Sequence, residues 1–299
     1  MRVILFFIDG LGLASAGELN PLWTTSTPCL ESLLEGHSLT QEAVGINNEH
    51  ATLLALDATL GVEGLPQSAT GQTTLFTGVN AAQMVGRHIS AFPTEPLRRI
   101  LSDQGLLKKL TESGKTANFL NGYRPQFFLD LPRSKRGYSA TTLLNLYAGL
   151  PFHTIEDIAS GRALCMDMTN ESFRLLDLAV PDTAAEEAGK ILARNAQHYD
   201  FLLYEYFLTD KFAHKRDHEN IARCITHIDN FLAGIISTID RRDTLLIVTS
   251  DHGNIEDLST STHSLNPVPL LLIGAGRENL PTLTSLTEVT PLILQLLHH

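Results

Sequence analysis

Short apolar runs alternate with amphipathic segments along much of the chain, at spacings typical of strands and helices. The apolar runs predict buried strands at Val3–Ile8, Thr116–Leu120, Phe201–Tyr206, Leu245–Thr249 and Val268–Ile273. Apolar residues that recur every three or four positions predict helices at Leu106–Ser113, Thr183–His198, Ile221–Ile239 and Glu288–Leu297. This alternation predicts an α/β fold in which a largely parallel sheet carries helices on both faces.

Residues 122–170 interrupt this alternation, because basic residues, Pro and Gly are frequent there and the periodicity is weaker. We expect this segment to form a small insertion or lid over the sheet edge. The rest of the pattern is continuous and shows no internal repeat, so we expect one domain over residues 1–299.

Composition and net charge argue against a nucleic-acid-binding or membrane-spanning protein. The 299 residues include 22 Lys and Arg against 33 Asp and Glu, for a formal net charge of -11. A surface of that sign repels phosphate backbones, so a nucleic-acid partner is not expected. No apolar run approaches the ~20 residues that span a bilayer, and three scattered cysteines suit a reducing compartment. We therefore expect a soluble cytoplasmic protein with no membrane partner.

Acidic residues follow three of the predicted strands. Asp9 comes directly after the first strand, Asp210 lies beyond the run that ends at Tyr206, and Asp251 lies beyond the run that ends at Thr249. The carboxyl ends of parallel strands meet at one edge of a sheet, so we expect these carboxylates to converge. Twelve histidines beside few cysteines favour a site built from His and Asp ligands.

Three histidines accompany these acids. On a helical turn, Asp210 and His214 would share one face and could bind one metal, although such a pair alone is more often a surface salt bridge. His252 directly follows Asp251, and His263 lies eleven residues further along the chain. With Asp9, these residues supply six N/O ligands, which we place in loops after predicted strands. Six such ligands and a Ser nucleophile can hold two divalent cations, a pair suited to in-line displacement at phosphorus.

A segment rich in small and hydroxyl-bearing residues runs from Gly64 to Gly78 and predicts a helix that ends near Gly78. A Ser or Thr at the start of a helix lies in the field of unpaired N–H groups, which favours an anion there. The alternative to such an anion site is a serine that only caps the first turn of the helix.

Together, these segments resemble the alkaline phosphatase superfamily, and within it the branch of cofactor-independent phosphoglycerate mutase and phosphopentomutase. The resemblance rests on IDGLG at 8–12, DKFAH at 210–214, HIDNFLAGII at 227–236, and DHGN at 251–254 followed by THSLNPVPLLL. It implies an alkaline phosphatase-like α/β metalloenzyme with two divalent cations, Mn²⁺ or Zn²⁺. By position, one cation is held by Asp9, Asp251, His252 and the nucleophile, and the other by Asp210, His214 and His263.

The resemblance also implies a Ser or Thr nucleophile in the segment 64–78. Counting ten residues back from Gly78 gives Ser68, and the string SATGQ that begins there resembles the S-x-x-G-H of the mutases. A register that matches GQT to the mutase GNS gives Thr73 instead, and Thr70 is a third alternative. We favour Ser68.

Substrate contacts are less specific. Gln72 stands where the mutases carry His, and we expect it to contact the substrate together with Arg87, His88 and Arg124. Arginine binds phosphate through two parallel hydrogen bonds, but a surface ion pair explains each arginine equally well. The segment 122–170 is much shorter than the inserted domain of the mutases, which argues against close identity with either of them.

The implied activity is phosphoryl transfer on a small phosphate ester through a Ser or Thr phospho-enzyme, as a phosphatase or a phosphomutase. A phosphodiesterase or a sulfatase of the same superfamily is the alternative within this class. The sulfatase is disfavoured because the residues after Ser68 lack the C/S-x-P-x-R pattern. A non-catalytic member that only binds metal is disfavoured because six ligands and a hydroxyl are all present. The sequence leaves the natural substrate and the oligomeric state open.

Overall fold

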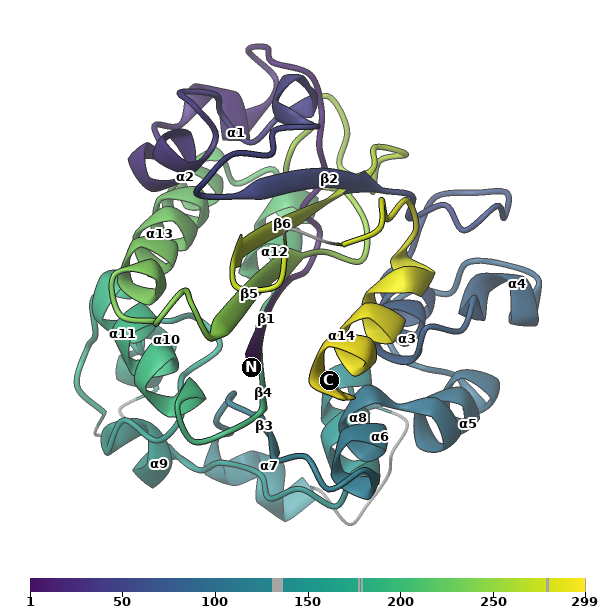
Figure 1. Ribbon diagram of the computed structural model, residues 1–299, viewed down its shortest axis with the longest axis vertical. Helices are drawn as coiled ribbons and strands as arrows, with labels where there is room; N and C mark the ends of the chain where they lie inside the picture. Colours follow the sequence, from purple (N-terminus) through teal and green to yellow (C-terminus); the bar gives the residue numbers. More distant parts are fainter. Residues whose placement is uncertain (131–136, 177, 179, 278–279, 299) are drawn as a thin grey trace.

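The protein is built around one mixed sheet (Figure 1), seen in a computed structural model that describes residues 1–130, 137–176, 178, 180–277 and 280–298. Within these residues the strands lie in the order β2-β6-β5-β1-β4-β3. Their bounds are β1 (Arg2–Ile8), β2 (Thr52–Leu56), β3 (Ala117–Phe119), β4 (Phe201–Tyr206), β5 (Thr244–Thr249) and β6 (Val268–Gly274). Strands β3, β4, β1 and β5 run parallel to one another, whereas β6 runs antiparallel to both of its neighbours, β5 and β2. The predicted α/β fold with a largely parallel sheet is confirmed.

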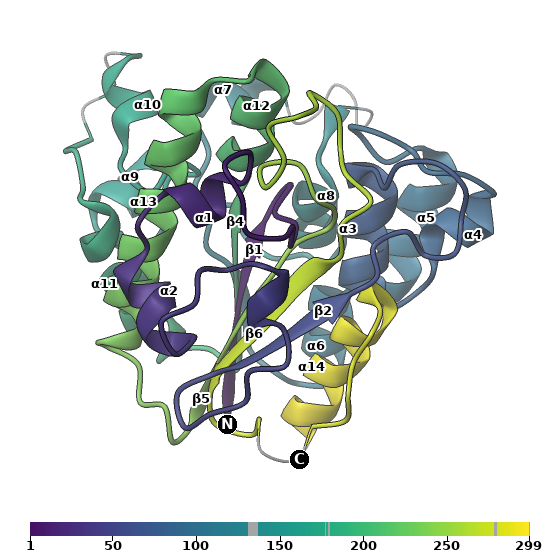
Figure 2. The same cartoon turned by 90° about the horizontal axis from the view of Figure 1, so that it is seen from above.

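Helices cover both faces of this sheet (Figure 2). One face packs against α11 (Ala185–Ala196) and α13 (His218–Ile236). The other face packs against α3 (Ser68–Thr77), α6 (Leu106–Glu112), α8 (Ala140–Tyr147) and α14 (Val289–His298). The remaining α-helices are α1 (Pro21–Thr24), α2 (Pro28–Leu33), α4 (Ala81–Val85), α5 (Glu95–Gln104), α7 (Pro125–Asp130), α9 (Ile155–Ala159), α10 (Glu171–Arg174) and α12 (Leu208–Lys215). None of the described helices has the length and apolar character needed to cross a bilayer.

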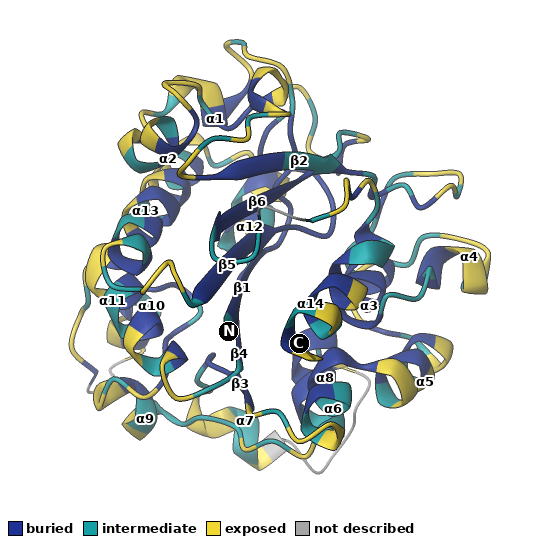
Figure 3. Ribbon diagram, viewed as in Figure 1, coloured by how far each residue is buried: buried dark blue, intermediate teal, exposed yellow. Residues whose placement is uncertain are grey.

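Strand β1 shows why an unbroken apolar run encodes a central strand. Val3, Leu5 and Phe7 belong to the core on the α3 and α14 side, and the residues between them belong to the core on the α11 and α13 side. Successive side chains of a strand point to opposite faces, so burial on both faces requires apolar residues at every position. The buried centre of the sheet is visible in Figure 3.

The apolar pattern located most of the elements that build this core. Each of the five predicted strands is present within one or two residues, and each of the four predicted helices overlaps an observed one. Helix α3 ends at Thr77, next to Gly78, as predicted, and Gly78 adopts the left-handed conformation. The sequence analysis missed β2, a partly exposed five-residue strand that pairs with β6 at the edge of the sheet. Its apolar run, LLAL, has only four residues, and so short a run does not distinguish a strand from a helix.

The segment 122–170, expected to be an insertion or lid, contains α7, α8 and α9. Helix α8 packs beside α3, α5 and α6, and its Leu143 and Leu144 lie in the core on that face of the sheet. Residues 131–136 of the segment lie outside the described part of the chain. The single-domain assignment and the lid stay predictions, and at least α8 is part of the main core.

A buried carboxylate on α13 holds the short helix α2 in place. Thr27 at the start of α2 makes no side-chain capping bond. Instead, Asp229 accepts hydrogen bonds from the backbone N–H groups of Cys29 at 3.1 Å and Leu30 at 2.8 Å. Asp229 is almost fully buried, so water could not accept these two hydrogen bonds if the carboxylate were absent. The acidic side chain therefore acts as the missing N-cap of α2.

Replacement of this carboxylate gives a first prediction. We expect Asp229→Ala to lower the free energy of unfolding by about 1–3 kcal/mol, because two backbone N–H groups lose their buried acceptor. Urea denaturation measures the change. Asp103→Ala, at an exposed position of α5, is the control and should leave the unfolding midpoint unchanged. An unaltered midpoint for the Asp229 variant would show that α2 does not depend on this cap.

Candidate metal centre

The carboxyl ends of β1, β4 and β5 bring the predicted ligands to one edge of the sheet. Asp9 directly follows β1, and Asp251 with His252 follows β5. The expectation that every ligand lies in a loop is wrong for Asp210 and His214, which lie on α12. The chain enters this helix at Leu208, two residues after β4 ends, so the i and i+4 side chains share one helix face.

Asp9, Asp251 and His252 form a first cluster, in which one ligand atom from each residue lies within 4.8 Å of the others. The Nε2 atom of His252 is 3.3 Å from Asp9 Oδ1 and 3.6 Å from Asp251 Oδ2. All three residues are buried, and Asp9 Oδ1 has no hydrogen-bond partner. Burial, together with the nearby carboxylates of Asp251 and Asp210, raises the pKa of Asp9 well above its usual range. A cation at this position would satisfy the orphaned oxygen and offset the repulsion between the carboxylates.

Asp210, His214 and His263 form a second cluster with the same spacing of ligand atoms. The Nε2 atoms of the two histidines face each other at 3.0 Å, and each is 3.4 Å from a carboxylate oxygen of Asp210. On the far side of the rings, His214 Nδ1 lies 2.9 Å from the carbonyl oxygen of Ser261, and His263 Nδ1 lies 2.7 Å from that of Pro66. A carbonyl only accepts hydrogen bonds, so each Nδ1 carries the proton.

The three side chains of the second cluster are arranged as they would be around a bound cation. In a neutral imidazole with Nδ1 protonated, Nε2 carries a lone pair, so two lone pairs and a carboxylate converge on one point. A backbone carbonyl that orients the remote ring nitrogen is typical of histidines that bind metals. In the absence of a metal, the hydrogen bond to Asp210 raises the pKa of His214 to about 9, so a proton takes the place of the cation.

Two glycines permit the close approach of the elements that carry these ligands. Gly10 has a φ of +70°, and a Cβ atom there would lie 2.9 Å from the Oδ1 atom of Asp210. A Cβ atom at Gly71 on α3 would lie 2.7 Å from the backbone oxygen of Asp251. A larger residue at either position would separate the two clusters or push α3 away from β5.

Of the three candidate hydroxyls, that of Ser68 faces the first cluster. Ser68 is the first residue of α3, is half-buried, and places its Oγ atom 3.0 Å from His252 Nε2. The hydroxyls of Thr73 and Thr70 are buried and donate to the backbone oxygens of Ala69 at 2.6 Å and Gln67 at 3.1 Å. The position of Ser68 supports its assignment as nucleophile, which stays a prediction.

The side chain of Gln72 contacts two of the candidate ligands. Its Nε2 atom donates to Asp9 Oδ2 at 3.1 Å and to Asp251 Oδ2 at 2.9 Å, and the residue is buried. Gln72 lies four residues after Ser68 on α3, on the same helix face. Its amide therefore holds one oxygen of Asp9 and leaves the orphaned Oδ1 free for a cation.

The other predicted substrate residues lie nearer the surface. Ile89 pairs with Thr70 through its backbone oxygen and nitrogen, so the segment with Arg87 and His88 runs beside the start of α3. Arg87 is exposed, whereas His88 is half-buried with Nε2 3.3 Å from the oxygen of Val62. Arg124 is exposed in the connection after β3. Their roles in substrate binding stay predictions.

Three polar residues of this region were not identified from the sequence. The Nδ2 atom of Asn254 donates to Asp210 Oδ1 at 2.7 Å, and Glu256 is a fully buried carboxylate in the same loop. Glu205 on β4 is buried and accepts a 2.6 Å hydrogen bond from Thr141. An acid inside the apolar run FLLYEY is the pattern that could have identified Glu205.

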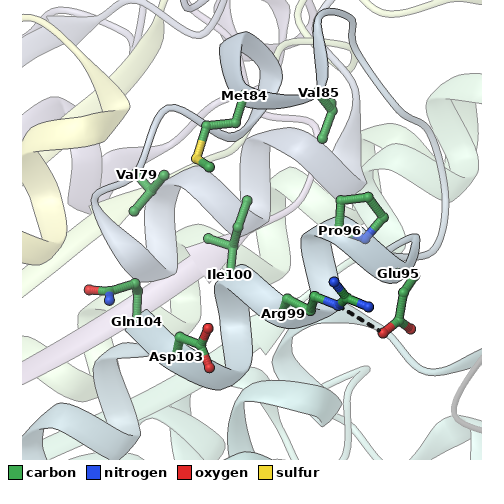
Figure 4. Close-up of a pocket in the computed structure, with 9 residues that line it drawn as sticks. All are labelled: Val79, Met84, Val85, Glu95, Pro96, Arg99, Ile100, Asp103 and Gln104. Carbon is green, nitrogen blue, oxygen red and sulfur yellow. Dashed lines mark hydrogen bonds and ion pairs between the residues drawn. The ribbon is translucent and has the colours of Figure 1, made fainter.

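The protein also has a cavity of about 770 Å³, whose lining residues are drawn in Figure 4. It lies between α4 and α5, beside the end of α3, and is lined by Val79, Met84, Val85, Glu95, Pro96, Arg99, Ile100, Asp103 and Gln104. Its walls are mainly apolar, with an ion pair between Glu95 and Arg99 at the rim. None of the candidate ligands lines it, so this cavity and the metal centre are separate features.

Parts of the chain are similar in sequence to known proteins. Residues 169–299, which include all the candidate ligands except Asp9 and Ser68, match the model of the Metalloenzyme superfamily. A 2,3-bisphosphoglycerate-independent phosphoglycerate mutase of Antithamnion sp. is 28% identical over 228 residues, or 70% of this chain and 38% of the relative. The same enzyme of Desulforudis audaxviator is 32% identical over 39% of this chain and 24% of the relative. The chain thus spans well under half the length of these relatives.

Solved structures agree in fold. A phosphoglycerate mutase of Leishmania mexicana aligns with a TM-score of 0.60 at 12% identity, over 99% of this chain and 95% of that one. An alkaline phosphatase of the Antarctic bacterium TAB5 aligns with a TM-score of 0.50 at 17% identity, over 99% and 98%. The chain therefore shares its fold with a phosphoglycerate mutase and an alkaline phosphatase, and residues 169–299 resemble the Metalloenzyme superfamily. This is the α/β architecture expected from the sequence.

Glu205 gives a second prediction. Burial raises its pKa to about 7 from a usual value of 4.5, so the native state keeps a proton that the unfolded chain has already released. Stability therefore falls as the pH rises from about 4.5 to about 7. In chelator-treated protein, we expect Glu205→Gln to raise the free energy of unfolding by ~3 kcal/mol above pH 7 and to leave it unchanged near pH 4.

Urea denaturation between pH 4 and pH 8 measures this effect. Glu18→Gln, at an exposed carboxylate, is the control and should follow the pH dependence of the unsubstituted protein. A gain for Glu205→Gln that is equal at both ends of the pH range would contradict the burial of a titrating carboxyl group.

Proposed function

We propose that this protein is a metal-dependent phosphoryl-transfer enzyme that acts on a small phosphate ester through a phosphorylated Ser68. The observation that carries the proposal is the position of the Ser68 hydroxyl, 3.0 Å from His252 in the first of two adjacent ligand clusters. The named activities of the relatives support the reaction class, since they are phosphoglycerate mutases.

The residues have separate roles in this proposal. Asp9, Asp251 and His252 would hold one divalent cation beside Ser68. Asp210, His214 and His263 would hold the second. Divalent cations bound there supply Lewis acidity to the phosphoryl oxygens and lower the pKa of a coordinated hydroxyl. Imidazole and carboxylate ligands suit Mn²⁺ and Zn²⁺ alike.

Ser68 is placed to attack because it opens a ten-residue helix. The partial positive charge at the N-terminus of α3 favours the anionic phosphoryl group and the phosphoserine that follows. As the Ser68 Oγ–phosphorus bond forms, the ester P–O bond breaks, the hydroxyl proton is released and the leaving alcohol takes up a proton. Water would then resolve the phospho-enzyme in a phosphatase, and an acceptor hydroxyl in a mutase.

Substitution of the nucleophile gives a third prediction. We expect Ser68→Ala to lower kcat on an aryl phosphate by at least ~10³-fold and to abolish the acid-stable phosphoserine seen by mass spectrometry. Metal content should not fall to the same extent, because three other ligands remain in the first cluster. Thr70→Ser, which keeps a hydroxyl on the same helix, is the control. Turnover of Ser68→Ala at the unsubstituted rate would eliminate Ser68 as the nucleophile.

Metal content gives a fourth prediction. We expect about two equivalents of Mn²⁺ or Zn²⁺ per chain and complete loss of turnover after chelation, since six ligands form two clusters. His263→Ala should reduce the content to about one equivalent, because the second cluster keeps only two ligands. His50→Ala, an exposed histidine beside Glu49, is the matched control. Elemental analysis after dialysis distinguishes these outcomes, and two retained equivalents in His263→Ala would contradict the ligand assignment.

A panel of phosphate monoesters, phosphodiesters and sulfate esters, each assayed with added Mn²⁺, decides between the reactions. Turnover of monoesters supports the proposal, whereas turnover of diesters or sulfates alone favours the other branches of the superfamily. Metal binding without turnover of any ester would favour a non-catalytic role. The cytoplasmic location and the lack of nucleic-acid and membrane partners stay predictions from composition and charge.

A further inference from the structure

A fully buried carboxylate, Glu256, accepts four hydrogen bonds close to the metal centre. Its Oε2 atom accepts from the backbone N–H groups of Gly12 at 2.9 Å and Asn254 at 2.8 Å. Its Oε1 atom accepts from the side chains of Ser264, through a short hydrogen bond, and Asn266 at 3.1 Å. Glu256 has no exposed surface, so these donors replace water around its two oxygens.

The four donors come from segments that carry metal ligands. Gly12 lies three residues after Asp9, and Ser264 directly follows His263. Asn254 and Glu256 follow the pair at 251–252 in the same connection between β5 and β6. Residues 250–267 of this connection contain no helix or strand, yet they carry three of the six ligands. A long irregular loop needs internal bonds to keep a fixed shape. Glu256 accepts three such bonds, from Asn254, Ser264 and Asn266, and a fourth from Gly12 outside the loop.

The Glu256 carboxylate occupies the space that a side chain would need at two glycines. A Cβ atom on Gly12 would lie 2.2 Å from Glu256 Oε1, and one on Gly253 would lie 2.3 Å from the same atom. Neither glycine has a positive φ, so backbone conformation does not require glycine at these positions. The space taken by Glu256 therefore explains both the second glycine of IDGLG and the glycine of DHGN.

We propose that Glu256 is a positioning residue that fixes the geometry of both metal clusters without touching a metal. It ties the segment after β1, with Asp9, to both arms of the β5–β6 connection, with Asp251 and His252 on one arm and His263 on the other. The inference rests on the proposed metal binding. Residues that orient metal ligands through hydrogen bonds typically change metal affinity by about 10–100-fold when they are replaced.

A merely structural role is the alternative, and Asp229 provides a matched comparison. It is also a buried carboxylate that accepts two backbone N–H groups, but it joins α13 to α2 and its donors, Cys29 and Leu30, flank no candidate ligand. If Glu256 served stability alone, its loss and the loss of Asp229 would affect metal binding equally.

The experiment measures Mn²⁺ and Zn²⁺ affinity by calorimetry on chelator-treated protein, and compares Glu256→Ala with Asp229→Ala. We expect Glu256→Ala to raise the Kd by about 10–100-fold for at least one cation and Asp229→Ala to leave it unchanged. Backbone bonds from Ile255 to Gly10 and from Leu13 to Pro267 remain in the Glu256 variant and support its folding. An unchanged Kd in Glu256→Ala, or an equal rise in both variants, would overturn the proposal.

Gly12→Ala gives a second route that keeps the carboxylate and also serves if Glu256→Ala does not fold. The added methyl group would displace Glu256, so the Kd should rise as in Glu256→Ala. In the double variant Gly12→Ala/Glu256→Ala, the Kd should be close to that of Glu256→Ala alone, since the carboxylate that the added methyl group would contact is absent. A Kd for Gly12→Ala within twofold of the unsubstituted protein would contradict the role of Glu256.

Hydrogen exchange in metal-free protein separates this inference from the proposed function. Loss of Glu256 should speed the exchange of the Gly12 and Asn254 amides by at least about tenfold and leave the amides of Cys29 and Leu30 protected. If the unsubstituted protein binds no metal, the proposed function fails whatever the exchange shows. Unchanged exchange at Gly12 in Glu256→Ala would overturn the tie between the two segments.

Discussion

The repulsion between three carboxylates at one edge of the sheet is the constraint on which the rest of the site depends. Asp9 and Asp251 are buried, and Asp210 is close enough to raise the pKa of Asp9 further. Buried like charges are stable only with compensating positive charge, from protons or from metal ions. The two histidines that face each other with their lone pairs add the same demand for a cation in the second cluster.

Bonds within the protein hold four of the six candidate ligands in position, with no need for an ion. Asp9 and Asp251 lie at the ends of two adjacent parallel strands, whose ladder fixes the distance between them. Gln72 bonds to one oxygen of each, and backbone carbonyls fix the rings of His214 and His263. In a site preorganised in this way, the charge repulsion is present before an ion binds, and a bound cation would relieve it.

The sequence alone predicted the features of the site that depend on the local pattern of apolar and polar residues. The apolar runs before Asp9, Asp210 and Asp251 predicted parallel strands, and parallel strands place their carboxyl ends together. It was insufficient where side chains act across the fold. Gln72 was expected to contact the substrate, yet it bonds to two carboxylates that lie 63 and 179 residues away in the chain. Nothing in the local sequence distinguishes Glu256 from an exposed glutamate, because its hydrogen-bond donors come from other segments of the chain.

Charge links these local interactions to the acidic chain as a whole. With a net charge of -11, the protein surface disfavours the approach of a phosphate ester. The three ligand carboxylates would add -3 at the site itself, whereas two divalent cations would contribute +4 and leave a local charge of +1. Under the proposed occupancy, metal binding would stabilise the clustered carboxylates and would also create a positive potential for an anionic substrate. The half-buried hydroxyl of Ser68, at the positive end of α3, lies where that potential and the helix dipole act together.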